Sequence, residues 1–297
     1  MFTPFFWILL VLVVVQYRRL ASMNIRLSGS TAGAVLKQTA VSTVHGIAGG
    51  LVGSVIMVLV GVSLTQVGVL YLWIVALMLM LINPRYLCFS YAGGLVSVSS
   101  ILFGFPRVDV PQLMGLVAVL HMVESVLIYF GGHHNPLAVY AAGRTGETAG
   151  AFLLQKFWPV PVVAFALLPL SAAPPGALLV EMPDWWPLIK PSLPVEDYFY
   201  AMMPVAAGLG YGDIAMAEYP RKKAQLSAAN LAVYSGILLI LAILSSHYDF
   251  LLLPAALFAP LGHELVVIKG RWRELAGEPL FVDPEGGVMV LEVVERS

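Results

Sequence analysis

The chain has 297 residues, of which 59% are hydrophobic and 11% are charged, and its mean hydropathy is +0.87. Soluble domains carry roughly 25% charged residues, so this composition excludes an ordinary soluble protein and indicates a chain surrounded by lipid. The formal net charge of -1 gives no indication of a nucleic-acid partner. The single cysteine, Cys88, excludes an internal disulfide and a multi-cysteine metal site. We interpret it as a small buried hydrophobic residue.

Nine apolar segments are predicted to cross a membrane as helices, because a span needs about 20 apolar residues and lipid offers no partner to free backbone groups. In chain order they are residues 2–17, 41–63, 66–83, 86–104, 110–131, 158–173, 198–216, 227–245 and 249–268. The first lacks the basic start and the small-residue cleavage site of a signal peptide, so we interpret it as a retained span. The expected fold class is therefore all-α, a polytopic membrane helix bundle of about nine spans.

The basic residues predict the orientation of this bundle. With the N-terminus outside, all of the 16 Lys and Arg residues except Arg107 and Lys190 fall on the inside. Such an excess in short loops marks the cytoplasmic face of a membrane protein. We therefore expect a transmembrane domain over residues 1–270 and a short cytoplasmic tail over residues 271–297.

The second predicted span carries a stripe of small residues. Gly46 and Gly50 form one pair spaced by four residues, and Gly49 and Gly53 form an overlapping pair. Small residues at this spacing let helix backbones approach closely. The stripe predicts helix packing within the chain, and a homo-oligomer interface is the alternative.

Five polar residues in the predicted spans are candidates for an intramembrane site, because ionisable side chains are costly in a bilayer. They are His121, Glu124, Asp213, His263 and Glu264. His121 and Glu124 lie three residues apart and hence on one helix face, where they fit either a hydrogen-bonded packing pair or a proton relay or ion site. Asp213 is expected near the inner interface, within reach of Lys222. The His263–Glu264 pair is expected as a polar cap near Asp213.

No complete catalytic set is present in the sequence. A membrane zinc protease needs His-Glu-x-x-His, and Val267 occupies the position of the second histidine after His263–Glu264. The Gly-x-Ser-x-Gly pattern of serine hydrolases is also missing. The sequence therefore predicts no enzymatic activity, no catalytic residue, no metal site and no cofactor.

The tail contains a pattern typical of a β-strand. Residues 288–294 alternate and are rich in β-branched side chains after Gly286–Gly287, and this segment is similar to the first strand of a PDZ domain. Four further segments contribute to a wider resemblance: RYLCFSYAGG at 85–94, KFWPVP at 156–161, GLGYGD at 208–213 and PLGHEL at 260–265. Together they resemble polytopic membrane proteins of Firmicutes with a C-terminal PDZ domain, the group of MinJ-like cell-division topology factors.

This resemblance implies a non-enzymatic scaffold or adaptor of the bacterial plasma membrane. Its partners would be the lipid bilayer and cytoplasmic or membrane proteins of cell division and polarity. The chain stops at Ser297, where the PDZ domain of that family continues, so a truncated PDZ-like domain is expected here. Two alternatives stay open: an ion-coupled or lipid-handling transporter built on the five polar residues, and a degenerate intramembrane protease that binds clients without cutting them.

Overall fold

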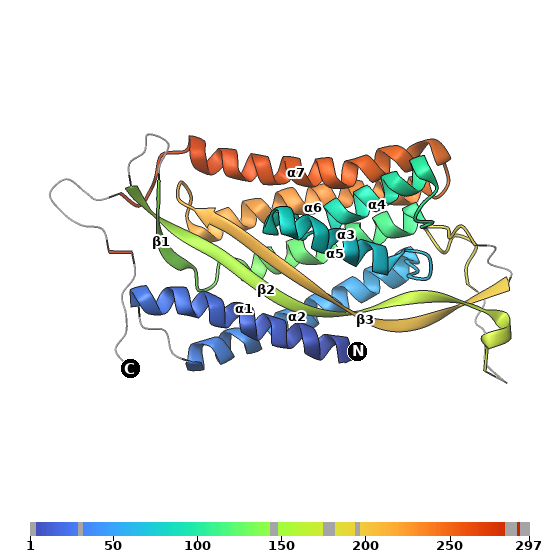
Figure 1. Ribbon diagram of the computed structural model, residues 1–297, viewed down its shortest axis with the longest axis horizontal. Coiled ribbons are helices and arrows are strands. Elements are labelled where there is room, and N and C mark those ends of the chain that lie inside the picture. The colour runs from blue at the N-terminus through green and yellow to red at the C-terminus, as the bar shows by residue number, and fades with distance from the viewer. Residues whose placement is uncertain are drawn as a thin grey trace.

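The computed structural model describes residues 4–28, 32–142, 148–174, 182–193, 197–282 and 290–291. Within these ranges the chain forms seven α-helices and one three-stranded antiparallel sheet of order β1-β2-β3 (Figure 1). The helices are α1 (Pro4–Ser28), α2 (Ala32–Val60), α3 (Val69–Ile82), α4 (Phe89–Phe103), α5 (Val110–Gly131), α6 (Pro220–Ser245) and α7 (Leu252–Ala276). The strands are β1 (Leu137–Ala142), β2 (Thr148–Pro169) and β3 (Tyr198–Ala215).

Five of the helices in the described ranges, α1, α2, α5, α6 and α7, are long and apolar enough to cross a membrane. They are compatible with membrane association. The expectation of about nine spans is wrong. The predicted spans 66–83 and 86–104 correspond to α3 and α4, whose 14 and 15 residues fall short of the roughly 20 that a bilayer requires.

The expectation of an all-α fold is also wrong, because the predicted spans 158–173 and 198–216 lie in β2 and β3. These strands pair continuously from Phe152 opposite Ala215 to Pro169 opposite Tyr198. A buried strand and a membrane helix share the same run of apolar residues, so hydrophobicity alone does not separate them. Pro159 and Pro161 would disrupt the interior of a helix, whereas proline is tolerated at the edge of a sheet.

From Phe157 onward, the edge of β2 that faces α1 and α2 has its N–H groups satisfied without a further strand. β1 covers this strand only up to Leu153. Beyond it, Phe157 donates to Tyr17 Oη (3.2 Å), Val163 to Ser54 Oγ (2.8 Å), Phe165 to the Val62 carbonyl (3.0 Å) and Leu167 to Thr65 Oγ1 (2.6 Å). The two alternate positions between them are prolines, which have no N–H group. This arrangement lets a sheet edge be buried among apolar helices.

The glycine stripe of α2 faces two different elements. A Cβ atom at Gly46 would lie 2.3 Å from the carbonyl oxygen of Pro159, and one at Gly50 would lie 2.0 Å from that of Pro161. These glycines therefore let α2 contact the β2 backbone directly. A Cβ atom at Gly53 would lie 2.7 Å from Val123 of α5. The close approach expected from the stripe thus involves a strand on one side and a helix on the other.

The helix at the centre of the molecule is α5. In its 18-residue apolar stretch 72% is buried, against 22% to 39% in the corresponding stretches of the other four long helices. It contacts α2, α4, α6, α7 and β3. The outer helices expose large apolar side chains, such as Trp7, Ile8 and Val11 on α1. Lipid is the solvent that suits such faces.

The expected boundary between residues 270 and 271 falls inside α7, which continues to Ala276. Beyond it, the Gly150 N–H group donates to the Phe281 carbonyl (2.7 Å), which fastens the start of the tail to β2. The predicted PDZ-like strand at residues 288–294 lies outside the described residues apart from Val290 and Leu291.

Candidate functional site

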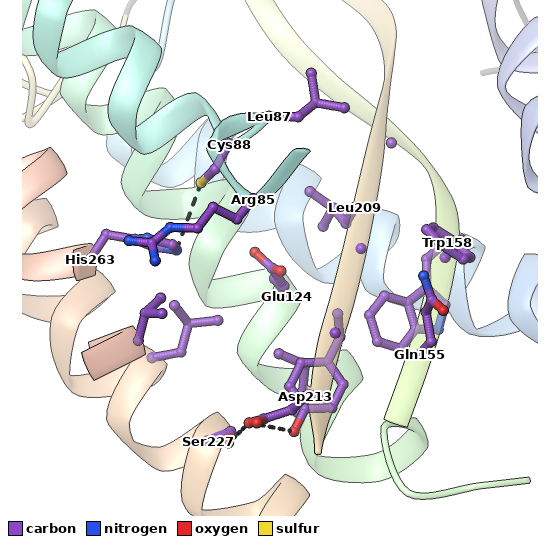
Figure 2. A pocket seen from close by; sticks show the side chains of 18 of the residues that line it. Arg85, Leu87, Cys88, Glu124, Gln155, Trp158, Leu209, Asp213, Ser227 and His263 are labelled. Atoms are coloured by element: carbon purple, nitrogen blue, oxygen red, sulfur yellow. Dashed lines mark hydrogen bonds between the residues drawn. The ribbon is translucent and has the colours of Figure 1, made fainter. Parts of the chain in front are cut away.

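A cavity of about 630 Å³ lies among α1, α5, α6, α7, β2, β3 and the segment that precedes α4. Apolar side chains line part of its wall, including Leu9 and Leu12 of α1 and Trp158 of β2. Charged and polar side chains line the rest. Figure 2 shows that Arg85, Cys88 and His263 lie together, that Glu124 enters from α5, and that Asp213 and Ser227 form a second polar group away from them.

On one side of the cavity, Cys88 lies beside two imidazole rings. Its Sγ atom is 3.2 Å from Nε2 of His121 and 3.7 Å from Nε2 of His263. The fold brings these residues together from the N-cap of α4, from α5 and from α7. One ligand atom from each lies within 4.8 Å of the others, a spacing at which three such side chains could hold a metal ion.

Two tyrosines enclose the imidazole rings. The ring of Tyr91 lies 5.1 Å from that of His263, and the ring of Tyr234 lies 5.6 Å from that of His121. The Tyr234 hydroxyl donates to the Ala259 carbonyl (2.8 Å), so its polar end is satisfied inside the helix bundle. The rings pack edge-on, a favourable geometry for aromatic groups, and they hold both histidines in place.

Glu264 is compensated by a cation, although it follows His263 directly in the chain. Its carboxylate forms an ion pair with Arg85 and accepts a hydrogen bond from the Tyr91 hydroxyl (2.6 Å). The hydrogen bond to Glu264 raises the pKa of Arg85. The partner of Glu264 is therefore the segment before α4 rather than the Asp213 region that the sequence suggested.

Asp213 lies at the cavity in a separate charged group. Its Oδ1 atom is 3.3 Å from Nζ of Lys223, and its Oδ2 atom accepts a hydrogen bond from Ser227 (2.9 Å). Lys223 also approaches Glu274 of α7 at 3.4 Å. Lys222, the partner expected from the sequence, instead pairs with Glu218 at 2.8 Å. This group joins the end of β3 to α6 and α7.

Glu124 differs from the other two cavity carboxylates because no described residue neutralises it. It is half-buried, lines the cavity, and has neither a hydrogen bond nor an ion pair within the described ranges. Burial raises the pKa of the Cys88 thiol to about 12, and the charge of Glu124 adds to this shift, so the two groups share one electrostatic environment. His121, one turn earlier on the helix, faces Cys88.

The structure thus brings three of the five candidate residues to the lining of one cavity: Glu124, Asp213 and His263. A fourth, His121, contacts Cys88 in the wall of that cavity. Glu264 lies behind them, held by Arg85. Sequence reasoning missed Cys88, because an isolated cysteine in an apolar chain is usually only a packing residue. Arg85 was predictable as the partner of an acidic residue, because a cation next to an apolar helix needs a carboxylate partner.

Comparison of the chain with protein-family models, with curated proteins and with solved structures finds no match.

Proposed function

We propose that the protein is an integral membrane transporter that binds and moves an amphipathic, lipid-like molecule through the central cavity. The observation that carries this proposal is the convergence of Glu124, Asp213 and His263 on one cavity of about 630 Å³. This volume lies within the range of sites for small organic ligands, roughly 300–1,000 Å³.

The lining of the cavity favours an amphipathic ligand. Leu9, Leu12 and Trp158 offer apolar surface, which suits an acyl or isoprenoid chain. Arg85, Glu124 and Asp213 offer polar contacts, which suit a headgroup. A ligand that is apolar at one end and polar at the other satisfies both parts of the wall at once.

Glu124 is the residue that we assign to ion coupling. A carboxylate without a cationic partner at membrane depth is costly, and such residues serve as sites for protons or metal cations in transporters. Asp213 and Glu264 are less suited to this role because Lys223 and Arg85 already neutralise them. Binding of a cation or proton at Glu124 therefore changes the charge of the cavity that receives the ligand.

The proposal is tested by the initial rate at which a fluorescent short-chain phospholipid moves between the two leaflets of proteoliposomes that contain the protein. With Glu124→Gln the initial rate is expected to fall at least about tenfold, because the amide keeps the shape and loses the charge, and tenfold corresponds to about 1.4 kcal/mol in the barrier. Glu278→Gln, at an exposed position after α7, is the matched control and keeps the parent rate.

Equal rates for the parent protein, the Glu124→Gln variant and protein-free vesicles would contradict the proposal. Elution as a single species and an unchanged melting temperature in detergent verify that Glu124→Gln is folded. The scaffold function expected from the resemblance stays a prediction, since most of the tail on which it depends lies outside the described residues.

A further inference from the structure

Cys88, His121 and His263 bring one ligand atom each within 4.8 Å of the others. Zinc binds a thiolate sulfur at about 2.3 Å and an imidazole nitrogen at about 2.0–2.1 Å, so tetrahedral angles place sulfur and nitrogen about 3.6 Å apart. The two S···N distances in this cluster are 3.2 and 3.7 Å. Because the three ligand atoms all lie this close to one another, one ion can be placed between them.

The ring of His121 is already oriented as a ligand. Its Nδ1 atom lies 2.7 Å from the Val117 carbonyl oxygen, and this oxygen can only accept, so Nδ1 carries the proton of the neutral ring. Nε2 then presents its lone pair toward Cys88. A hydrogen bond from the far nitrogen to a carbonyl is the usual support of a metal-binding histidine.

Cys88 and His263 each present a polar atom to the same cluster. Sγ of Cys88 lies at the N-cap of α4, where it accepts a hydrogen bond from the backbone N–H group of Ser90 (3.4 Å). Nδ1 of His263 is buried and lacks a hydrogen-bond partner within the described ranges. The Nε2 atom of His263 faces Sγ of Cys88. Within the described residues, this contact is the hydrogen bond that the His263 ring makes.

The charges also balance around a divalent ion. A thiolate leaves one positive charge on the ion, and the uncompensated Glu124 carboxylate in the same cavity neutralises it. Arg85 does not compete for Glu124, because its ion pair is with Glu264. A metal at Cys88 thus accounts for a carboxylate that no described cation neutralises.

We propose that Cys88, His121 and His263 bind one zinc-class transition-metal ion at the cavity wall. Thiolate and imidazole ligands select zinc, cobalt or copper over magnesium and calcium, which prefer oxygen ligands. Three protein ligands leave the fourth position free. Because Cys88 and His263 line the cavity, this position is open to water or to an oxygen atom of a bound molecule. The inference goes beyond the proposed transport and does not depend on it.

Metal titration of the purified full-length chain in detergent tests the site. The parent protein is expected to retain about one zinc per chain after desalting, measured by elemental mass spectrometry, as a three-ligand site predicts. Cobalt loading should give the visible bands of tetrahedral cobalt and a thiolate-to-cobalt charge-transfer band in the near ultraviolet. Cys88→Ser and His263→Gln should each weaken binding by more than about tenfold.

His247→Gln is the matched control, because this exposed histidine lies at the end of α6, away from the cluster. It should bind zinc like the parent protein. Cys88→Ser changes one atom, and an unchanged melting temperature of its metal-free form shows that the fold is intact. Loss of the charge-transfer band in this variant is required by the proposal, since Cys88 is the only cysteine in the chain.

The proposal is overturned if the parent protein binds less than one equivalent of zinc or cobalt, or if Cys88→Ser retains parental binding and the charge-transfer band. The three side chains would then form only a hydrogen-bonded cluster. Failure of transport leaves a different result. Glu124→Gln keeps all three ligands, so it should still give the thiolate-to-cobalt band, with a weaker affinity because a compensating charge is lost, while lipid movement disappears.

Discussion

Lys156 lies on β2 with 4% of its surface exposed, and its ammonium group has no hydrogen bond or ion pair among the described residues. Burial lowers its pKa to about 8, since removal from water penalises the charged ammonium group. The imidazole rings of His45 and His134 line the same small pocket. Lys156 is thus a residue whose charge opposes folding at neutral pH.

The stability of the parent protein is expected to increase as the pH rises above about 8. Above that value the native chain has released the Lys156 proton, whereas the unfolded chain keeps it up to pH 10.5, so deprotonation favours the native state. Each pH unit between the two pKa values contributes about 1.4 kcal/mol, so the whole gain is at most about 3.5 kcal/mol. Melting temperatures in detergent between pH 7 and pH 9.5 measure this effect.

Lys156→Met should melt higher than the parent protein at pH 7 and should lack this part of the pH dependence. The methionine keeps the length of the side chain and removes the charge. If both proteins show the same change in melting temperature over the interval, Lys156 is not the buried cation that the structure describes.

The roles of single residues were predictable only where a side chain conflicts with its surroundings. Glu124 and His263 were predictable as site residues because ionisable groups in apolar segments are costly, and both line the cavity. Cys88 has no such conflict. Its proximity to His121 and His263 depends on α4, α5 and α7 meeting in space, which residue type and spacing do not encode.

At the scale of elements, the contact between α2 and β2 explains why β2 can lie inside a helix bundle. Glycines at 46 and 50 remove the side chains that would separate the two backbones. Ser54, further along the same helix, accepts a hydrogen bond from Val163 of the strand (2.8 Å). The helix therefore replaces a neighbouring strand along this edge.

Gly50→Ala should destabilise the protein by at least about 2 kcal/mol, because overpacking against backbone that cannot move aside costs in this range or more. The added Cβ atom would lie 2.0 Å from the Pro161 carbonyl oxygen. Gly236→Ala on α6 is the matched control, since a Cβ atom there meets nothing within 4 Å and alanine is the better helix former. Thermal unfolding in detergent compares the two, and equal melting temperatures would contradict the α2–β2 contact.

The elements themselves were predictable where length and pattern agree. The span predicted at 110–131 coincides with α5, and the predicted segments 227–245 and 249–268 lie within α6 and within α7 and the short turn before it. Residues 158–173 and 198–216 were misassigned because pairing between two distant apolar segments leaves no signal in either one. The alternating prolines at 159 and 161 were the local indication of a strand.

At the scale of the whole molecule, the cavity is assembled from parts of the chain between Leu9 and Arg271. No local pattern predicts such a space. The molecule also has two distinct ends. Ser192 donates to Asp109 (2.8 Å), which places Lys190 and Arg107 near one end of α5, whereas Lys223 lies beside the last turns of α7. The orientation of the chain in a membrane and the cytoplasmic position of the tail stay predictions.

The central claim is that this assembly leaves one carboxylate, Glu124, uncompensated in an internal cavity while it neutralises the other two. A hydrophobic carbodiimide reacts with carboxyl groups in apolar surroundings that are not held in ion pairs. Treatment of the protein in membranes, followed by peptide mass spectrometry, measures which carboxylates react. The account predicts modification at Glu124, with Asp213 and Glu264 protected by Lys223 and Arg85. Preferential modification of Asp213 or Glu264, with Glu124 unmodified, would contradict it.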